Sequence, residues 1–98
     1  DQAIKNQKAG VFSIVLECIN TSTAKAITKS LQIPTIGIGS SVHCDGQILV
    51  TDDMLGLSGF YPKFVKKFVN LKNIIEIAVK KYKKAVRTKK FPNKKNTY

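Results

Sequence analysis

One acidic residue, Glu17, stands where a protein can use a carboxylate as a base. It directly follows the apolar, β-branched run Val11–Leu16, which is typical of a strand buried on both faces of a parallel sheet. Such folds place their chemistry at the carboxyl ends of strands, and partial desolvation there raises the proton affinity of a carboxylate toward that of a general base. Position alone leaves a second interpretation equally open, an ion pair between Glu17 and a lysine of a neighbouring loop.

Two glycines resemble the start of a dinucleotide-binding motif. Gly37 and Gly39 have the first spacing of that fingerprint, but Val42 occupies the position of its third glycine, so the match fails. We interpret the glycines as residues that let a strand end turn tightly and bring backbone amides close to a ligand.

Two further clusters carry metal-binding or nucleophilic residue types. His43, Cys44 and Asp45 are adjacent in a loop and point in different directions, and the chain has one histidine, so we predict a structural role for them. Asp52 and Asp53 could bind magnesium, but two neighbouring carboxylates without a third are more typical of helix capping.

The cysteines indicate a reducing compartment. Cys18 and Cys44 lie 26 positions apart and neither has a CxxC partner, whereas a disulfide scaffold or a structural zinc site needs more ligands at tighter spacing. We therefore expect free thiols and a cytoplasmic protein.

Basic residues are concentrated in one part of the chain. Residues 1–59 hold four Lys and five acids, whereas residues 60–98 hold thirteen Lys or Arg and one acid, within a net charge of +11. A basic half often binds nucleic acid or a membrane surface. Sixteen of the seventeen basic residues are Lys, however, and base and phosphate recognition favours Arg. We favour a lysine-rich solvated helix surface, with no nucleic-acid and no membrane partner.

The order of the expected elements is typical of an α/β protein with a parallel sheet. We expect strands at 11–16, 35–39 and 47–51, a helix at about 21–31, and a long helix from Pro62 to Val86 that breaks near Asn70. The first nine residues resemble the end of a helix, so the chain is expected to begin in mid-domain. Three strands with so few helices leave sheet edges open, which favours part of a larger barrel over a complete domain.

Several motifs in order give the chain a resemblance to ketopantoate hydroxymethyltransferases that covers nearly its whole length. The segments that carry it are Ala9–Cys18, Pro34–Gly39, His43–Val50, Asp53–Leu57, Pro62–Lys66 and the ending Phe91–Tyr98. Ser40-Ser41 departs from the family's usual Ala-Gly pair, which affects the expected loop shape. The resemblance implies an eight-stranded (β/α) barrel, of which residues 1–98 are the C-terminal part with the sixth, seventh and eighth strands.

The resemblance also implies a reaction. The family transfers the methylene of 5,10-methylenetetrahydrofolate to the 2-oxo acid 3-methyl-2-oxobutanoate, giving 2-dehydropantoate for pantothenate biosynthesis. Magnesium chelates the oxo acid and acidifies the carbon next to its ketone, a glutamate removes that proton, and the enolate attacks the one-carbon unit. Glu17 falls on that glutamate, whereas the magnesium ligands and the substrate-binding serine and lysine belong to earlier strands.

Other functions stay open at this stage. The chain could belong to another 2-oxo-acid lyase of the phosphoenolpyruvate mutase and isocitrate lyase group, or be an inactive remnant with a basic binding helix. For the transferase we expect a homo-oligomer at full length, with the 98 residues inactive by themselves.

Overall fold

The structure is a computed structural model that describes all 98 residues. Its elements, in chain order, are α1 (Gln2–Lys8), β1 (Ile14–Glu17), α2 (Thr21–Ser30), β2 (Thr35–Ile38), β3 (Gly46–Gln47), α3 (Thr51–Leu55) and α4 (Leu71–Arg87). The three strands form one open parallel sheet in the order β1-β2-β3. The expected α/β fold with parallel strands is therefore confirmed.

Local sequence explains where α2 begins and ends. The side chain of Asn20 accepts a hydrogen bond from the backbone N–H of Thr23 at 2.9 Å and so caps the helix, as expected for this residue type. Leu31 leaves the helix with an extended backbone, and Pro34, which cannot continue a helix, precedes β2. The chain then returns to lie parallel to β1.

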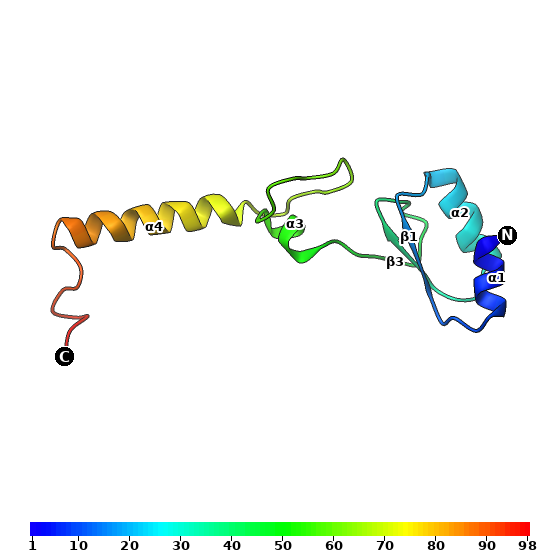
Figure 1. Cartoon of the computed structure of the whole chain (residues 1–98), viewed down its shortest axis with the longest axis horizontal. Helices are drawn as coiled ribbons and strands as arrows, with labels where there is room; N and C mark the ends of the chain where they lie inside the picture. Colours follow the sequence, from blue (N-terminus) through cyan, green and yellow to red (C-terminus); the bar gives the residue numbers. More distant parts are fainter.

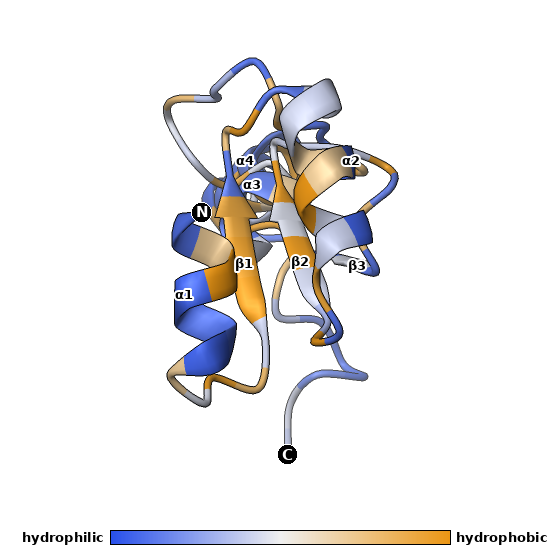
Figure 2. Ribbon diagram, turned by 90° about the vertical axis from the view of Figure 1, so that its right-hand side faces the viewer, coloured by the Kyte–Doolittle hydropathy of each residue, from blue (hydrophilic) through white to orange (hydrophobic).

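The sheet has one covered face and one uncovered face. Leu16, Ala24 and Cys44 form the buried hydrophobic core on the α2 side, and the pairing of Leu16 with Gly37 places both residues on that side. Val15 points to the opposite face and is 53% exposed. Figure 2 shows the apolar β1 beside β2, and Figure 1 shows α1 and α2 on the same side of the sheet. Nothing in the chain covers the second face of β1.

The molecule is elongated. Its extents are 67 × 29 × 16 Å and its radius of gyration is 22.4 Å, whereas a compact domain of this length has a radius of about 13 Å. Figure 1 shows the strands with α1 and α2 at one end and α4 extending away from them, beyond α3. No helix is both long enough and apolar enough to cross a membrane.

Two expected elements were wrong in extent. The strand expected at 47–51 is only the two residues of β3, because β2 ends at Ile38 and leaves Leu49 and the residues after it without a strand alongside. Thr51 begins α3 instead of ending a strand. The strand expected at 11–16 begins at Ile14 and continues to Glu17.

The long helix begins later than expected. Residues 62–70 are not helical, and the expected break near Asn70 is the start of α4, where the Asn70 side chain accepts a hydrogen bond from the N–H of Asn73. The preceding backbone packs on α3 instead: the N–H of Phe68 donates to the carbonyl of Met54 at 2.8 Å. A long-range contact therefore overrides the helical periodicity of this segment.

Candidate active site

Glu17 is the last residue of β1, at the carboxyl edge of the sheet. It pairs with Ile38, the last residue of β2, and it shares the uncovered face with Val15 because side chains alternate along a strand. Its position at the strand end, beside the loop that follows β2, agrees with expectation. The expected partial desolvation of the carboxylate is not observed. The side chain of Glu17 is exposed, because no other element covers that face.

The chain turns sharply directly after Glu17. Cys18 has φ of 53°, a left-handed conformation that costs a residue with a Cβ about 1 kcal/mol or more. Its N–H donates to the carbonyl of Ile38 at 2.9 Å, and its free thiol is exposed. The turn ends the ladder between β1 and β2 and directs the following residues toward α2.

Ser40 ties this turn to the loop after β2. Its hydroxyl donates to the carbonyl of Leu16 at 2.6 Å and accepts from the N–H of Ile19 at 3.1 Å. The two backbone groups lie on either side of Glu17 and Cys18, so one side chain bridges the segment that carries the carboxylate. Ser40 is the first residue of the Ser40-Ser41 pair that replaces the family's usual Ala-Gly, where we expected a different loop shape. The sequence alone did not indicate this bridge.

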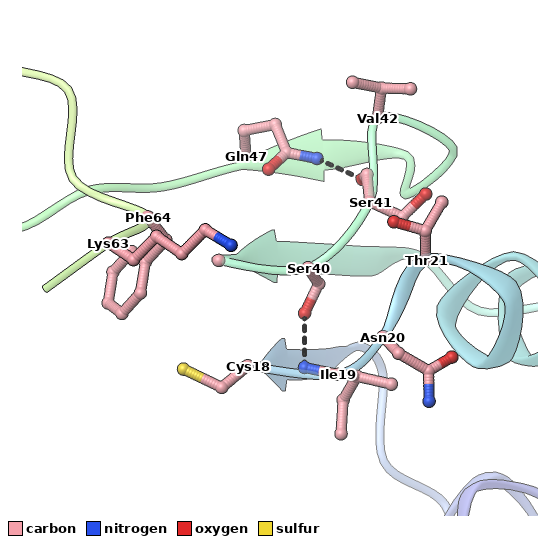
Figure 3. A pocket seen from close by; sticks show the side chains of 11 residues that line it. Cys18, Ile19, Asn20, Thr21, Ser40, Ser41, Val42, Gln47, Lys63 and Phe64 are labelled. Atoms are coloured by element: carbon pink, nitrogen blue, oxygen red, sulfur yellow. Dashed lines mark hydrogen bonds between the residues drawn. The ribbon is translucent and has the colours of Figure 1, made fainter.

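A cavity of about 670 Å³ opens at the carboxyl ends of β1 and β2. Its lining comes from three connections: Cys18 to Thr21 after β1, Gly39 to Val42 after β2, and Lys63 with Phe64 from the loop after α3, together with Gln47 of β3. Figure 3 shows these side chains around the opening. Glu17 does not line the cavity, but its neighbour Cys18 does.

Gly39 and Phe64 define one wall of this cavity. Gly39 has φ of 63°, and a Cβ on it would lie 2.6 Å from Cγ of Phe64. Only glycine leaves room for the ring at this strand end. The expected tight turn agrees with this geometry at Gly39, whereas Gly37 lies within β2. The approach of backbone amides to a ligand there stays a prediction.

The three adjacent residues of the histidine-containing loop have separate environments. His43 is exposed, Cys44 belongs to the buried core, and Asp45 bonds to Thr35. The backbone N–H and the hydroxyl of Thr35 donate to Oδ2 of Asp45 at 2.8 and 3.1 Å. These hydrogen bonds, the backbone one first, hold the pKa of Asp45 below its ordinary value of 3.8. Asp45 thus fastens the start of β2 to the loop before β3.

Asp52 and Asp53 lie in the first turn of α3, and neither caps it. Val50 is the N-cap residue and makes no side-chain capping bond, so the expected capping role was wrong, although carboxylates in a first turn interact favourably with the helix dipole. Asp53 accepts a short hydrogen bond from the hydroxyl of Ser58. The 98 residues contain no group of three His, Cys, Asp or Glu side chains that could hold a metal ion.

The family model described as ketopantoate hydroxymethyltransferase matches residues 1–94. The chain belongs to this family. The match includes β1 with Glu17 and every segment that lines the cavity.

Named relatives agree with the family match. The chain is 56% identical over 92 residues to a 3-methyl-2-oxobutanoate hydroxymethyltransferase of Pelagibacter ubique, covering 94% of this chain and 36% of the relative. It is 50% identical over 99 residues to the protein of that name in Bdellovibrio bacteriovorus, covering 100% of this chain and 38% of the relative. The chain therefore spans about a third of the length of these relatives.

Proposed function

We propose that this chain contributes to the transfer of a hydroxymethyl group from 5,10-methylenetetrahydrofolate to 3-methyl-2-oxobutanoate, which gives 2-dehydropantoate in pantothenate biosynthesis. Support comes from the family match over residues 1–94 and from the shared name of the relatives. Because the chain spans about a third of those relatives, the activity is assigned to a longer protein of which these residues form one part. By themselves the 98 residues are expected to be inactive.

Within that protein we assign residues 1–98 to the C-terminal part of a single (β/α)8 barrel, with β1, β2 and β3 as its sixth, seventh and eighth strands. Parallel strands with open edges, an uncovered face on β1 and an elongated shape all support this assignment. Further barrel strands would cover that face. A homo-oligomer would cover part of the apolar surface of α4.

Glu17 is assigned the role of general base. Its carboxylate lies at the carboxyl edge of the sheet, where barrel enzymes carry their chemistry. It would take the proton from the carbon next to the ketone, and the electrons of the broken C–H bond would pass to the carbonyl oxygen as an enolate. That enolate would then form the new C–C bond to the methylene carbon of the folate, while the electron pair of one C–N bond of the methylene bridge passes to its nitrogen. Cleavage of the second C–N bond and addition of water would give the hydroxymethyl group and release tetrahydrofolate.

Magnesium, which the family resemblance implies, does not fit the residues of this chain. A hard cation of this kind prefers a set of oxygen ligands in near-octahedral geometry, and these 98 residues contain no group of three His, Cys, Asp or Glu side chains that could hold a metal ion. We therefore assign its ligands to earlier strands of the longer protein, and to this chain only the base.

Exchange of the substrate proton tests the assignment of Glu17. We define a chimaera in which this chain replaces the 92-residue stretch that it matches in the Pelagibacter ubique relative. With 3-methyl-2-oxobutanoate in heavy water, Glu17→Gln should slow deuterium incorporation by roughly 10²-fold or more, because the amide keeps the shape of the side chain but cannot accept the proton.

Glu76→Gln is the matched control, since it makes the same chemical change on an exposed side chain of α4. It should leave the exchange rate within about twofold, as is usual for a change remote from the reacting atoms. Exchange at the unmodified rate in the Glu17→Gln protein would show that another group is the base.

A further inference from the structure

We infer that the cavity at the carboxyl ends of β1 and β2 is the subsite for the folate donor, with Lys63 facing a carboxylate of the ligand and Phe64 packing against one of its rings. This inference rests on the proposed function and deepens it, because it states which of the two substrates this part of the molecule recognises. Four features of the cavity support it: its position, its size, the charge and polarity of its lining, and the absence of an aromatic partner for Lys63.

The position of the cavity separates it from the oxo acid. A general base must come within hydrogen-bond reach of the proton that it removes, so the oxo acid belongs beside Glu17 on the uncovered face of the sheet. The cavity begins one residue later, at Cys18, and excludes Glu17. A ligand in it would lie next to the oxo acid, where a donor of the one-carbon unit has to be.

The size of the cavity suits the larger substrate. Pockets of roughly 300–1,000 Å³ hold ligands of drug size, and this cavity measures about 670 Å³. A five-carbon oxo acid would fill only a small part of that volume. A folate, with its fused ring system, aromatic linker and glutamate, is of the size that such a cavity holds.

The lining matches an anionic, partly aromatic ligand. Ile19, Val42 and Phe64 supply apolar surface, Lys63 supplies a positive charge, and no acidic residue lines the cavity. A folate offers rings to the apolar surface and carboxylates to the ammonium group. Aromatic packing and a charge-assisted hydrogen bond would each add to its affinity.

Lys63 differs from the other lysines of the same loop. Nζ of Lys66 lies 5.2 Å from the ring centroid of Phe68, and Nζ of Lys67 lies 4.4 Å from that of Tyr61, so both ammonium groups already interact with aromatic rings. Lys63 makes no such contact and lines the cavity instead. Figure 3 shows it entering beside Phe64, from the side opposite the connection between β1 and α2.

Binding of 5-formyltetrahydrofolate to the chimaera, measured by equilibrium dialysis, tests the inference. Lys63→Gln should raise the dissociation constant roughly 1.5-fold to fivefold, the range for a charge pair at an exposed site, and added salt should reduce the difference. Phe64→Leu should raise it by about fivefold through loss of ring packing. Lys67→Gln is the matched control: it removes the same charge from the same loop, outside the cavity, and should leave binding unchanged.

Deuterium exchange into 3-methyl-2-oxobutanoate, measured without folate, separates this inference from the proposed function. Both substitutions in the cavity should preserve the exchange rate and its dependence on oxo-acid concentration. If they preserve exchange and leave folate binding unchanged, or if Lys67→Gln weakens binding as much as Lys63→Gln, the subsite is wrong while the proposed function stands. If Lys63→Gln weakens binding of the oxo acid and leaves binding of the folate unchanged, the two substrates are assigned to the wrong places. If the unmodified chimaera shows no exchange, the proposed function fails and this inference fails with it.

Discussion

The two halves of the chain differ in how far their side chains are packed. Six of the seven buried residues lie before residue 50, in the strands, in α2 and in the loop before β3, and the only one after it is Gly56. α4, by contrast, is 17 residues long and has no buried residue. Its apolar stripe remains in contact with water, with Ile75 47% and Tyr82 59% exposed.

This difference predicts that α4 depends on contacts outside the chain more than the first half does. A helix of that length is marginal in water unless an apolar face is packed, and the stripe on α4 has the spacing of a core-facing helix. The first half holds a small core and a network of long-range hydrogen bonds. These place Glu17 and the loops after β1 and β2 that line part of the cavity, but they leave one face of the sheet uncovered. The accessible surface of 7877 Å² compares with about 5,500 Å² for a compact protein of this mass.

The largest effect is expected for the 98 residues made alone. Because so little apolar surface is buried and the sheet edges are open, the isolated chain should show a broad thermal transition or should associate, without a sharp cooperative melt. It should form no measurable 2-dehydropantoate with magnesium and the folate donor. Calorimetry with analytical ultracentrifugation, and a product assay, provide the measurements. A cooperative melt from a monomer would show that the two halves stabilise each other without further strands.

A smaller effect on the free energy of unfolding is expected when one apolar residue of either half is truncated within the chimaera. Leu16→Ala should lower the free energy of unfolding by about 2–4 kcal/mol, since Leu16 is 6% exposed in the core. Ile75→Ala should cost at least about 1 kcal/mol if other parts of the longer protein cover α4, although this side chain is half exposed in the chain alone. Chemical denaturation measures both. A cost below about 0.5 kcal/mol for Ile75→Ala, the value typical of a surface position, would show that α4 stays uncovered.

The smallest effect concerns pH and belongs to the first half. Because the pKa of Asp45 is lowered on folding, its hydrogen bonds to Thr35 add stability above the unfolded value of 3.8, and this contribution is lost as the pH falls through the folded pKa. The melting temperature of the chimaera should exceed that of its Asp45→Asn variant at neutral pH, and the gap should narrow below pH 3.8. A gap that is constant with pH would mean that the charge of Asp45 does not contribute.

Local signals predicted much of the first half. Asn20 marked the start of α2 and Pro34 the approach to β2, because capping and proline geometry depend on a few neighbouring residues. The placement of Glu17 at a strand end followed from the apolar run before it. The same signals failed between residues 60 and 70, where the apolar spacing continues that of α4 but Phe68 pairs with Met54 of α3. Periodicity does not reveal such a pairing.

The sequence by itself determined the order of the three strands with α2 and α4, the parallel α/β class, the family and the position of Glu17, because each depends on residues close together in the chain or on motifs in a fixed order. Only the tertiary structure brought Lys63 and Phe64 to a cavity bordered by Cys18, 45 positions earlier than Lys63. It also decided that Asp45 bonds to Thr35 and that Ser40 bridges the turn after Glu17. Such contacts form when strands pair side by side and bring together residues that lie far apart in the sequence. Hydrophobic periodicity, which reports on near neighbours, does not reveal them.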